Sequence, residues 1–392
     1  EMLNGTPGYI NLLDAIGAWQ LVRELRLATG KPGAASFKHV SPAGAAIARP
    51  LDEAFLKSQF LDREDLSPVA TAYVRARGGD RLCSFGDVAA VSDTVDASLA
   101  RVLAREVCDL IIAPGYDADA LEILKNKRGG KFLILRIDPD YEPPAVESRQ
   151  LFGFTLEQQR NDARIATGMF KKPVTPGAKV PDDVAETLAV ATITLKYTQS
   201  NSVCLAYQGQ VIGNGAGQQS RVHCMRLACS KADKWFMQQH PKVLGLKFKE
   251  GLMKAEKANV VDQYLIWDEL SEPEERFMLS QLTARPEPLT RKERTDWIAK
   301  FDDVCVSSDA FFPFRDSIDR ASRSHVKYVA HPGGSLRDAA VLIPIVDRGD
   351  EAGVILTTRA KALRSHSGQV SFPGGRLDPT DPTPEHAALR ET

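Results

Sequence analysis

The chain has 392 residues, of which 43% are hydrophobic and 26% are charged, a composition typical of globular proteins. Its length predicts two or three domains. The net charge of −1 provides no overall positive field for nucleic acid or an anionic membrane surface, so local groups must hold any anionic ligand.

The sequence has no apolar run of the length needed to span a bilayer, and its first residues lack the basic-then-apolar pattern of a signal peptide. Its six cysteines form no CxxC pair. We therefore expect buried thiols in a reducing cytoplasm, with no disulfides and no zinc site. These cysteines are Cys83, Cys108, Cys204, Cys224, Cys229 and Cys305.

Residues 10–29 carry apolar side chains at helical spacing and are followed by Gly30 and Pro32, which predicts a helix. A short strand of small residues, 34–37, then leads to Lys38 and His39. Ser41 and Pro42 are typical of a helix N-cap and first helical residue. The elements predicted further along the first half are strands at 88–91, 110–113 and 133–137 and a helix at 96–107.

Residues 142–182 are rich in Pro, Lys and Asp and are predicted to cross between two halves of the fold. The elements predicted in the second half are a helix at 185–197 and strands at 203–207, 210–212 and 326–330. Repeated strand–loop–helix units predict layered α/β subdomains.

Lys38 and His39 are the first candidates for chemistry, because they stand at the end of a predicted strand. Histidine can carry a proton near neutral pH, and lysine can stabilise a developing oxyanion. The predicted helix start beside them would add backbone donors for an anion. The alternative is a surface lysine next to a hydrogen-bonded histidine.

Two loops are further candidates. The glycine-rich stretch 213–217 precedes Arg221, so its backbone could approach a ligand that Arg221 contacts, or it could be a turn between strand and helix. The stretch 307–316 has three phenylalanines among charged residues. These could hold a flat heterocycle beside a carboxylate, or anchor the loop in the core.

Six segments follow one another in a fixed order, and together they resemble a known family. They are "LNGTPGYINLLDAIGAWQLV", "SFKHVSPAGAA", "RARGGDRLCSFGD", "REVCDLIIAPGY", "KYTQSNSVCLAYQGQVIGNGAGQQSRVHC" and "SSDAFFPFRDSIDRA". Residues 3–337 resemble the aminoimidazole-carboxamide ribonucleotide (AICAR) formyltransferase domain of bifunctional purine-biosynthesis enzymes. The resemblance implies transfer of a formyl group from 10-formyltetrahydrofolate, as co-substrate, to the amine of AICAR in inosine monophosphate (IMP) biosynthesis.

The resemblance also implies roles for individual residues. His39 would transfer the proton, and Lys38 would stabilise charge on the formyl oxygen. AICAR contacts would be Gly86, Asp109, Asn201, Arg221 and Phe311. Folate contacts would be Val222, Asp316, Ser335 and Leu336. The zinc motif of the deaminases is not in the sequence, so we expect no catalytic metal.

The fold implied is α/β, with duplicated cytidine-deaminase-like layered subdomains at about 1–150 and 185–337. Family active sites form at a dimer interface, so the resemblance implies a homodimer with shared sites. The sequence has no cyclohydrolase segment, so ring closure to IMP is not expected. It also has neither of the family's terminal arginine-bearing segments that contact AICAR, which would weaken substrate binding.

Residues 338–392 have a different character. The string "LTTRAKALRSHSGQVSFPGGRLDPTDPTPEHAALRET" resembles the start of a Nudix hydrolase of the coenzyme A pyrophosphatase type. The sequence ends before the Glu-Glu pair that would bind magnesium, so we expect no hydrolase activity. Three hypotheses follow: a formyltransferase, a non-catalytic fusion of the two parts, or the front of a Nudix hydrolase. We also expect residues 339–346 to dock on or near the formyltransferase sheet as a substitute for the family's last strand, because an exposed sheet edge favours pairing.

Overall fold

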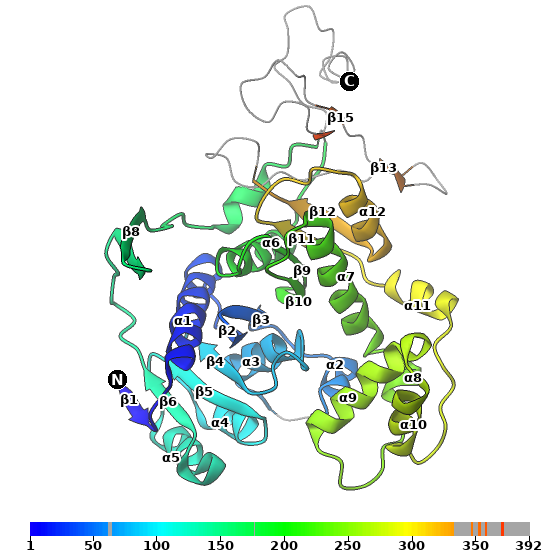
Figure 1. The fold of residues 1–392 in the computed structure, drawn as a ribbon, viewed down its shortest axis with the longest axis horizontal. Coiled ribbons are helices and arrows are strands. Elements are labelled where there is room, and N and C mark those ends of the chain that lie inside the picture. The colour runs from blue at the N-terminus through cyan, green and yellow to red at the C-terminus, as the bar shows by residue number, and fades with distance from the viewer. Residues whose placement is uncertain are drawn as a thin grey trace, which may run out of the picture.

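The computed structural model describes residues 1–61, 65–175 and 177–332, together with four two-residue strands beyond them, β13 to β16. Twelve α-helices lie in the described ranges: α1 Tyr9–Thr29, α2 Glu53–Ser58, α3 Pro68–Gly78, α4 Ala97–Ala104, α5 Ala118–Asn126, α6 Asp182–Lys196, α7 Arg221–Met237, α8 Pro241–Leu244, α9 Lys254–Leu265, α10 Glu272–Ser280, α11 Arg291–Ile298 and α12 Asp316–Arg323. Figure 1 shows α1, α3, α6 and α7 beside a large sheet, and α8, α9 and α10 grouped together apart from it.

The strands of residues 1–332 are β1 Met2–Asn4, β2 Gly33–Lys38, β3 Ser41–Ile47, β4 Asp87–Val91, β5 Cys108–Ala113, β6 Leu133–Arg136, β7 Val146–Leu151, β8 Phe154–Gln159, β9 Val203–Tyr207, β10 Gln210–Gly215, β11 Val304–Ser308 and β12 Val326–Ala330. Ten of these form one sheet in the order β1-β6-β5-β4-β2-β3-β10-β9-β11-β12. The remaining two, β7 and β8, pair only with each other. The molecule is therefore a mixed α/β protein built on a single long sheet.

The two halves of the sheet repeat one topology. In the first half, α1 leads to the antiparallel hairpin β2–β3, β4 pairs antiparallel with β2, and β5 pairs parallel with β4. In the second half, α6 leads to the hairpin β9–β10, β11 pairs antiparallel with β9, and β12 pairs parallel with β11. The hairpins meet at the centre, where β3 and β10 pair antiparallel. This match confirms the duplicated, layered α/β fold expected from the sequence.

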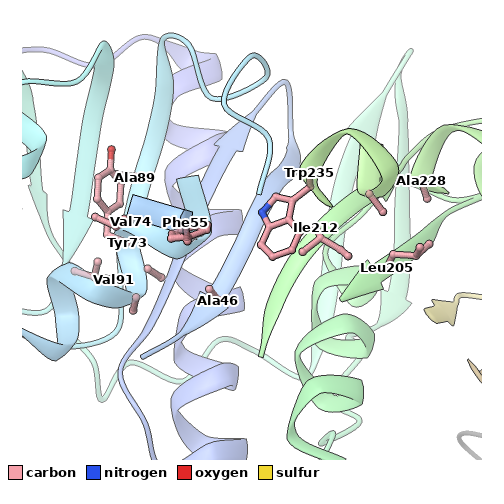
Figure 2. Close-up of a cluster of buried hydrophobic side chains, with 14 of the residues drawn as sticks. Ala46, Phe55, Tyr73, Val74, Ala89, Val91, Leu205, Ile212, Ala228 and Trp235 are labelled. Atoms are coloured by element: carbon pink, nitrogen blue, oxygen red, sulfur yellow. The ribbon is translucent and has the colours of Figure 1, made fainter. Parts of the chain in front are cut away.

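Alternation along each strand divides the core between the two faces of the sheet. On β2, Ala35 and Phe37 pack with α1 and α6, whereas Ala34 points to the face covered by α3 and α7. Figure 2 shows that second face, where Tyr73 of α3 and Trp235 of α7 belong to the same apolar cluster. Burying side chains of this size stabilises the fold by about 1.5–3 kcal/mol each. Because the cluster includes strands of both halves, the halves share one core.

The prediction of a helix that starts at Ser41 and Pro42 was wrong, because these residues begin strand β3. The β2–β3 register shifts at this point, so that Ser36 is opposite Gly44 while Phe37 is opposite Pro42. Such a bulge tolerates proline in a strand. The following small residues are buried between β2 and β10, and burial in the sheet overrides their weak local preference.

The stretch 213–217 also differs from both sequence interpretations, because residues 213–215 belong to β10. A Cβ on Gly215 would lie 2.2 Å from the carbonyl oxygen of Cys224 in α7. In the first half, a Cβ on Gly44 would lie 2.1 Å from the carbonyl oxygen of Ala76 in α3. These glycines therefore allow a helix to pack closely against each central strand.

Three further expectations concern the cysteines, membrane-spanning helices and the C-terminal boundary. The six cysteines are free thiols, and all but Cys83 are buried. None of the helices in the described ranges is long and apolar enough to cross a membrane. The domain boundary predicted at 337 lies outside the described residues, as does most of the 339–346 segment. Its described residue, Val346, pairs with Gly353.

Candidate active site

The candidate residues of the described ranges lie at one end of the long sheet. Lys38 ends β2, and the antiparallel partner β4 begins at that same end, just after Gly86. Asp109 is the second residue of β5, which runs parallel to β4. In the second half, Asn201 precedes β9, Arg221 follows β10 and Phe311 follows β11. Strand direction therefore brings residues from distant parts of the sequence to a common edge.

His39 and Val40 form the two-residue turn of the β2–β3 hairpin, with φ angles of 55° and 60°. Such a turn requires positive φ at both positions, which is unusual for a histidine and costly for a β-branched valine. Strained backbone of this kind clusters at functional sites. The sequence placed His39 beside a helix start, whereas the structure places it at the tip of a hairpin.

Asp14 of α1 holds this turn. Its Oδ1 atom accepts a hydrogen bond from the Val40 backbone N–H at 2.6 Å, and its side chain is buried. Burial raises the pKa of Asp14, although backbone hydrogen bonds and the nearby His39 act in the opposite direction. Sequence reasoning missed Asp14, yet its spacing from Ala18, Leu21 and Leu25 places it on the buried face of the helix.

Lys38, His39, Gly86 and Asp109 form what we call the turn cluster. The Lys38 ammonium donates a hydrogen bond to the Phe85 carbonyl at 2.6 Å, which leaves it two further N–H donors. The adjacent Gly86 has a φ of 72°, and a Cβ there would lie 3.6 Å from Asp109 Oδ2. The Asp109 carboxylate also pairs with Arg128 at 2.5 Å.

The side chain of His39 is exposed in the single chain, and Lys38 is partly buried. The imidazole of His39 is therefore accessible to solvent in the single chain.

A buried polar network holds the backbone segment that the turn cluster contacts. The Ser36 hydroxyl donates to Asp87 Oδ2 at 2.5 Å, and its oxygen lies within hydrogen-bond distance of the Ser84 hydroxyl, at 2.8 Å. Arg77 pairs with the other oxygen of Asp87 at 2.7 Å, and both side chains are almost fully buried. Since Ser84 and Asp87 flank Phe85 and Gly86, this network fixes the backbone that Lys38 contacts.

Asn201, Arg221, Asp309 and Phe311 form what we call the arginine cluster. The buried Arg221 guanidinium donates to the Ser202 carbonyl at 2.9 Å and to Asn201 Oδ1 at 3.1 Å, and it forms an ion pair with Asp309. Asp309 was not among the predicted site residues, although it directly follows a buried strand. Its carboxylate orients the guanidinium, and Phe311 lies two residues further on, partly buried.

The predicted folate contacts are less closely grouped. Val222 is the second residue of α7, next to Arg221, and Asp316 is the exposed first residue of α12. Ser335 and Leu336 lie outside the described residues. Of the three phenylalanines in the 307–316 stretch, Phe312 is buried in the core, which agrees with the anchoring alternative for that residue.

The two clusters together extend along a long stretch of the sheet edge: the β2–β3 turn is next to β10, whereas Asp109 and Phe311 lie near its far ends. Six strand-to-strand steps separate β5, which carries Asp109, from β11, which precedes Phe311. At about 4.8 Å per step this is about 29 Å, longer than a mononucleotide. One small substrate therefore cannot contact both Asp109 and Phe311 of the same chain.

Comparison with known proteins agrees with this arrangement of motifs. The family model described as "AICARFT/IMPCHase bienzyme" matches residues 1–231. The chain belongs to this family. A NUDIX domain model matches residues 336–392, where the sequence predicted a Nudix segment; the coenzyme A pyrophosphatase subtype stays a prediction.

Curated relatives extend the match toward the C-terminus. The bifunctional purine biosynthesis protein PurH of Roseobacter denitrificans is 28% identical over 348 residues, which is 89% of this chain and 51% of that protein. PurH of Sorangium cellulosum is 26% identical over 355 residues, which is 90% of this chain and 50% of that protein. The chain thus spans about half the length of the curated relatives it matches.

The described residues contain no group of three or more His, Cys, Asp or Glu side chains placed to hold a metal ion. The turn cluster itself provides the His39 imidazole, the Lys38 ammonium group and the Asp109 carboxylate.

Proposed function

We propose that this chain transfers a formyl group from 10-formyltetrahydrofolate to the 5-amino group of AICAR, a step of purine biosynthesis. One observation carries the proposal: the strained β2–β3 turn, held by Asp14, presents His39 beside Lys38. The chain that carries this turn cluster belongs to the AICARFT/IMPCHase family. The names of the curated relatives, which are purine biosynthesis proteins, support it.

The residues at the turn suit the reaction. The AICAR amine is a weak nucleophile, and it becomes positively charged as its nitrogen attacks the formyl carbon. His39 would accept a proton from this nitrogen, while the Lys38 ammonium would stabilise the negative charge on the formyl oxygen. Collapse of the intermediate breaks the bond from the formyl carbon to N10 of the folate, and that nitrogen takes up a proton. Lys38 is already oriented by its bond to the Phe85 carbonyl.

We further propose that each active site joins the turn cluster of one chain with the arginine cluster of a second. The separation of about 29 Å between Asp109 and Phe311 of one chain supports this, because AICAR is too small to contact both. The exposure of His39 also supports it, since proton transfer at an amine benefits from a site closed to water. Arg221 and Asn201 would then contact the AICAR held by the partner.

Formyl transfer can be tested with the parent chain, the His39→Ala variant and the control variant His240→Ala, whose histidine is the N-cap residue of α8. We expect His39→Ala to lower kcat by about 10²–10⁴-fold, the usual contribution of a general base, and His240→Ala to keep the parent value. The readout is product formation from AICAR and 10-formyltetrahydrofolate. A parent chain without turnover at saturating substrates would reject the proposal and favour the non-catalytic fusion.

The shared site predicts complementation between two defective chains. His39→Ala and Arg221→Gln should each be nearly inactive alone. In a refolded equal mixture, half the dimers pair the two variants and one of their two sites is intact, so about a quarter of the parent activity should return. No recovery in a mixture shown to contain mixed dimers would place both clusters in the same chain's site.

A further inference from the structure

Arg128 is a charged residue beside the turn cluster that has no part in the reaction proposed above. It lies in the short segment Lys127–Gly130, between α5 and β6, and its guanidinium pairs with Asp109 at 2.5 Å. Because β6 runs parallel to β5, the segment that leads into β6 lies at the same end of the sheet as Asp109. Sequence reasoning missed Arg128, since no local pattern shows that this segment reaches the site.

The backbone that carries Arg128 is fixed on both sides. The ammonium of the buried Lys127 donates a hydrogen bond to the Glu106 carbonyl, and the Asn4 side chain donates to the Gly130 carbonyl at 3.0 Å. Arg128 itself has a φ of 55°, which is unusual for a residue other than glycine. Its side chain is nevertheless 52% exposed. The segment thus holds the guanidinium at the edge of the site and leaves it accessible to a ligand.

The pair of Arg128 and Asp109 offers a ligand hydrogen-bond donors and an acceptor side by side. A guanidinium has five N–H donors, and the contact with Asp109 Oδ1 uses one of them. The other carboxylate oxygen, Oδ2, faces Gly86, where a Cβ would lie 3.6 Å away. Phosphate oxygens match the guanidinium fork, and hydroxyl groups donate to a carboxylate. A sugar phosphate carries both kinds of group within a few bonds of each other.

The spacing along the sheet edge fits one nucleotide. Two strand-to-strand steps, from β2 through β4 to β5, separate Lys38 from Asp109, which is about 10 Å. In AICAR the bonds from the reacting amine to the phosphorus, at about 1.5 Å each, reach at most about 10 Å. A nucleotide whose amine lies at His39 and Lys38 can therefore place its phosphate at Arg128.

We infer that Arg128 binds the 5′-phosphate of AICAR and thereby selects the nucleotide over its nucleoside. The inference rests on the proposed function, which supplies the substrate, and adds the residue that recognises its charged group. A phosphate monoester carries about −1.5 to −2 charges at pH 7, and an unpaired Asp109 carboxylate would repel it. Arg128 meets both requirements, because its guanidinium neutralises Asp109 and still has N–H groups to donate to the phosphate.

Kinetics of the full-length chain with AICAR and with its nucleoside, which lacks the phosphate, test the inference. We expect Arg128→Gln to raise KM for AICAR about 10–100-fold, because hydrogen bonds between charged groups are lost. Its kcat should stay within about threefold of the parent, and its KM for the nucleoside should equal that of the parent. The control Arg276→Gln removes an exposed arginine that pairs with Glu272 in α10, and should match the parent with both acceptors.

A second comparison separates contact with the phosphate from neutralisation of Asp109. The double variant Arg128→Gln, Asp109→Asn loses the carboxylate charge together with the guanidinium. If Arg128 contacts the phosphate, its preference for nucleotide over nucleoside stays about 10–100-fold below that of Asp109→Asn alone. A double variant with the same preference as Asp109→Asn overturns the inference, and so does an Arg128→Gln variant that weakens both acceptors equally.

Calorimetric titration of the same chains with AICAR and with the nucleoside makes the test independent of turnover. A parent that binds AICAR through Arg128 but transfers no formyl group would refute the proposed function and leave the phosphate contact in place. A parent that transfers the formyl group, while Arg128→Gln binds AICAR as tightly as the parent does, would refute the phosphate contact and leave the proposed function in place.

Discussion

Asp14 links the first helix to the turn that carries His39, and its effect can be separated into geometry and charge. Its Oδ1 atom accepts the Val40 N–H at 2.6 Å, while both central residues of the turn have positive φ. A single hydrogen bond to a charged group contributes about 1.5–3 kcal/mol, which is comparable to the cost of the strained backbone. The turn therefore depends on this contact to hold the imidazole in place.

Replacing Asp14 tests this positioning role. Asp14→Ala removes the acceptor and should lower kcat about tenfold or more with a smaller change in KM, because the turn relaxes without loss of the groups that bind substrate. Asp14→Asn keeps an oxygen at the same place and should restore most of the loss. Steady-state kinetics of the three chains, with circular dichroism to verify folding, decides the matter. Equal kcat in parent and Asp14→Ala would show that the turn holds without Asp14.

At the residue scale the sequence identifies candidate groups by their chemical type, but it does not reveal the contacts that position them. Lys38, His39 and Arg221 were identified from residue type and from family motifs, and the structure places them at one end of the sheet. Asp14 and Asp309 were missed, because their importance comes from a contact with a residue 26 or 88 positions away. Residue type and spacing alone carry no information about such contacts.

At the scale of elements, the long periodic segments were predicted well, and the central strand was not. The helix expected at 10–29 is α1, and the strands expected at 203–207 and 326–330 have the predicted bounds. The prediction failed at β3, because a Ser-Pro pair followed by alanines and a glycine has little intrinsic preference for a strand. Its strand conformation comes from pairing with β2 and β10, and its small residues let α3 pack closely. Such residues are selected by the packing of neighbours that lie far away in the sequence.

The whole molecule is held together by a shared core and by buried ion pairs between elements. Glu106, which follows α4, is almost fully buried and pairs with Arg77, with Arg81 and with Lys254 of α9. This carboxylate therefore connects the first half to the helices α8 to α11, which lie between α7 and β11 in the sequence. Burial by itself would raise the pKa of Glu106, but the three cations outweigh burial and hold the pKa below its usual value.

This balance predicts how stability depends on pH. Because the folded pKa of Glu106 is lowered, its contribution is fully present above the unfolded value of about 4.3 and is lost as the pH falls through the folded pKa. Glu106→Gln leaves buried cations without their counter-charge and should lower the free energy of unfolding by about 3–5 kcal/mol at pH 7.

Urea unfolding of the parent, of Glu106→Gln and of the exposed control Glu122→Gln measures this effect between pH 7 and pH 3. The difference between the parent and Glu106→Gln should stay constant down to about pH 4.3 and then shrink, because the parent carboxylate becomes protonated as well. The control should follow the parent throughout. A difference that is small at pH 7, or that grows as the pH falls, would mean that the cations around Glu106 do not depend on its charge.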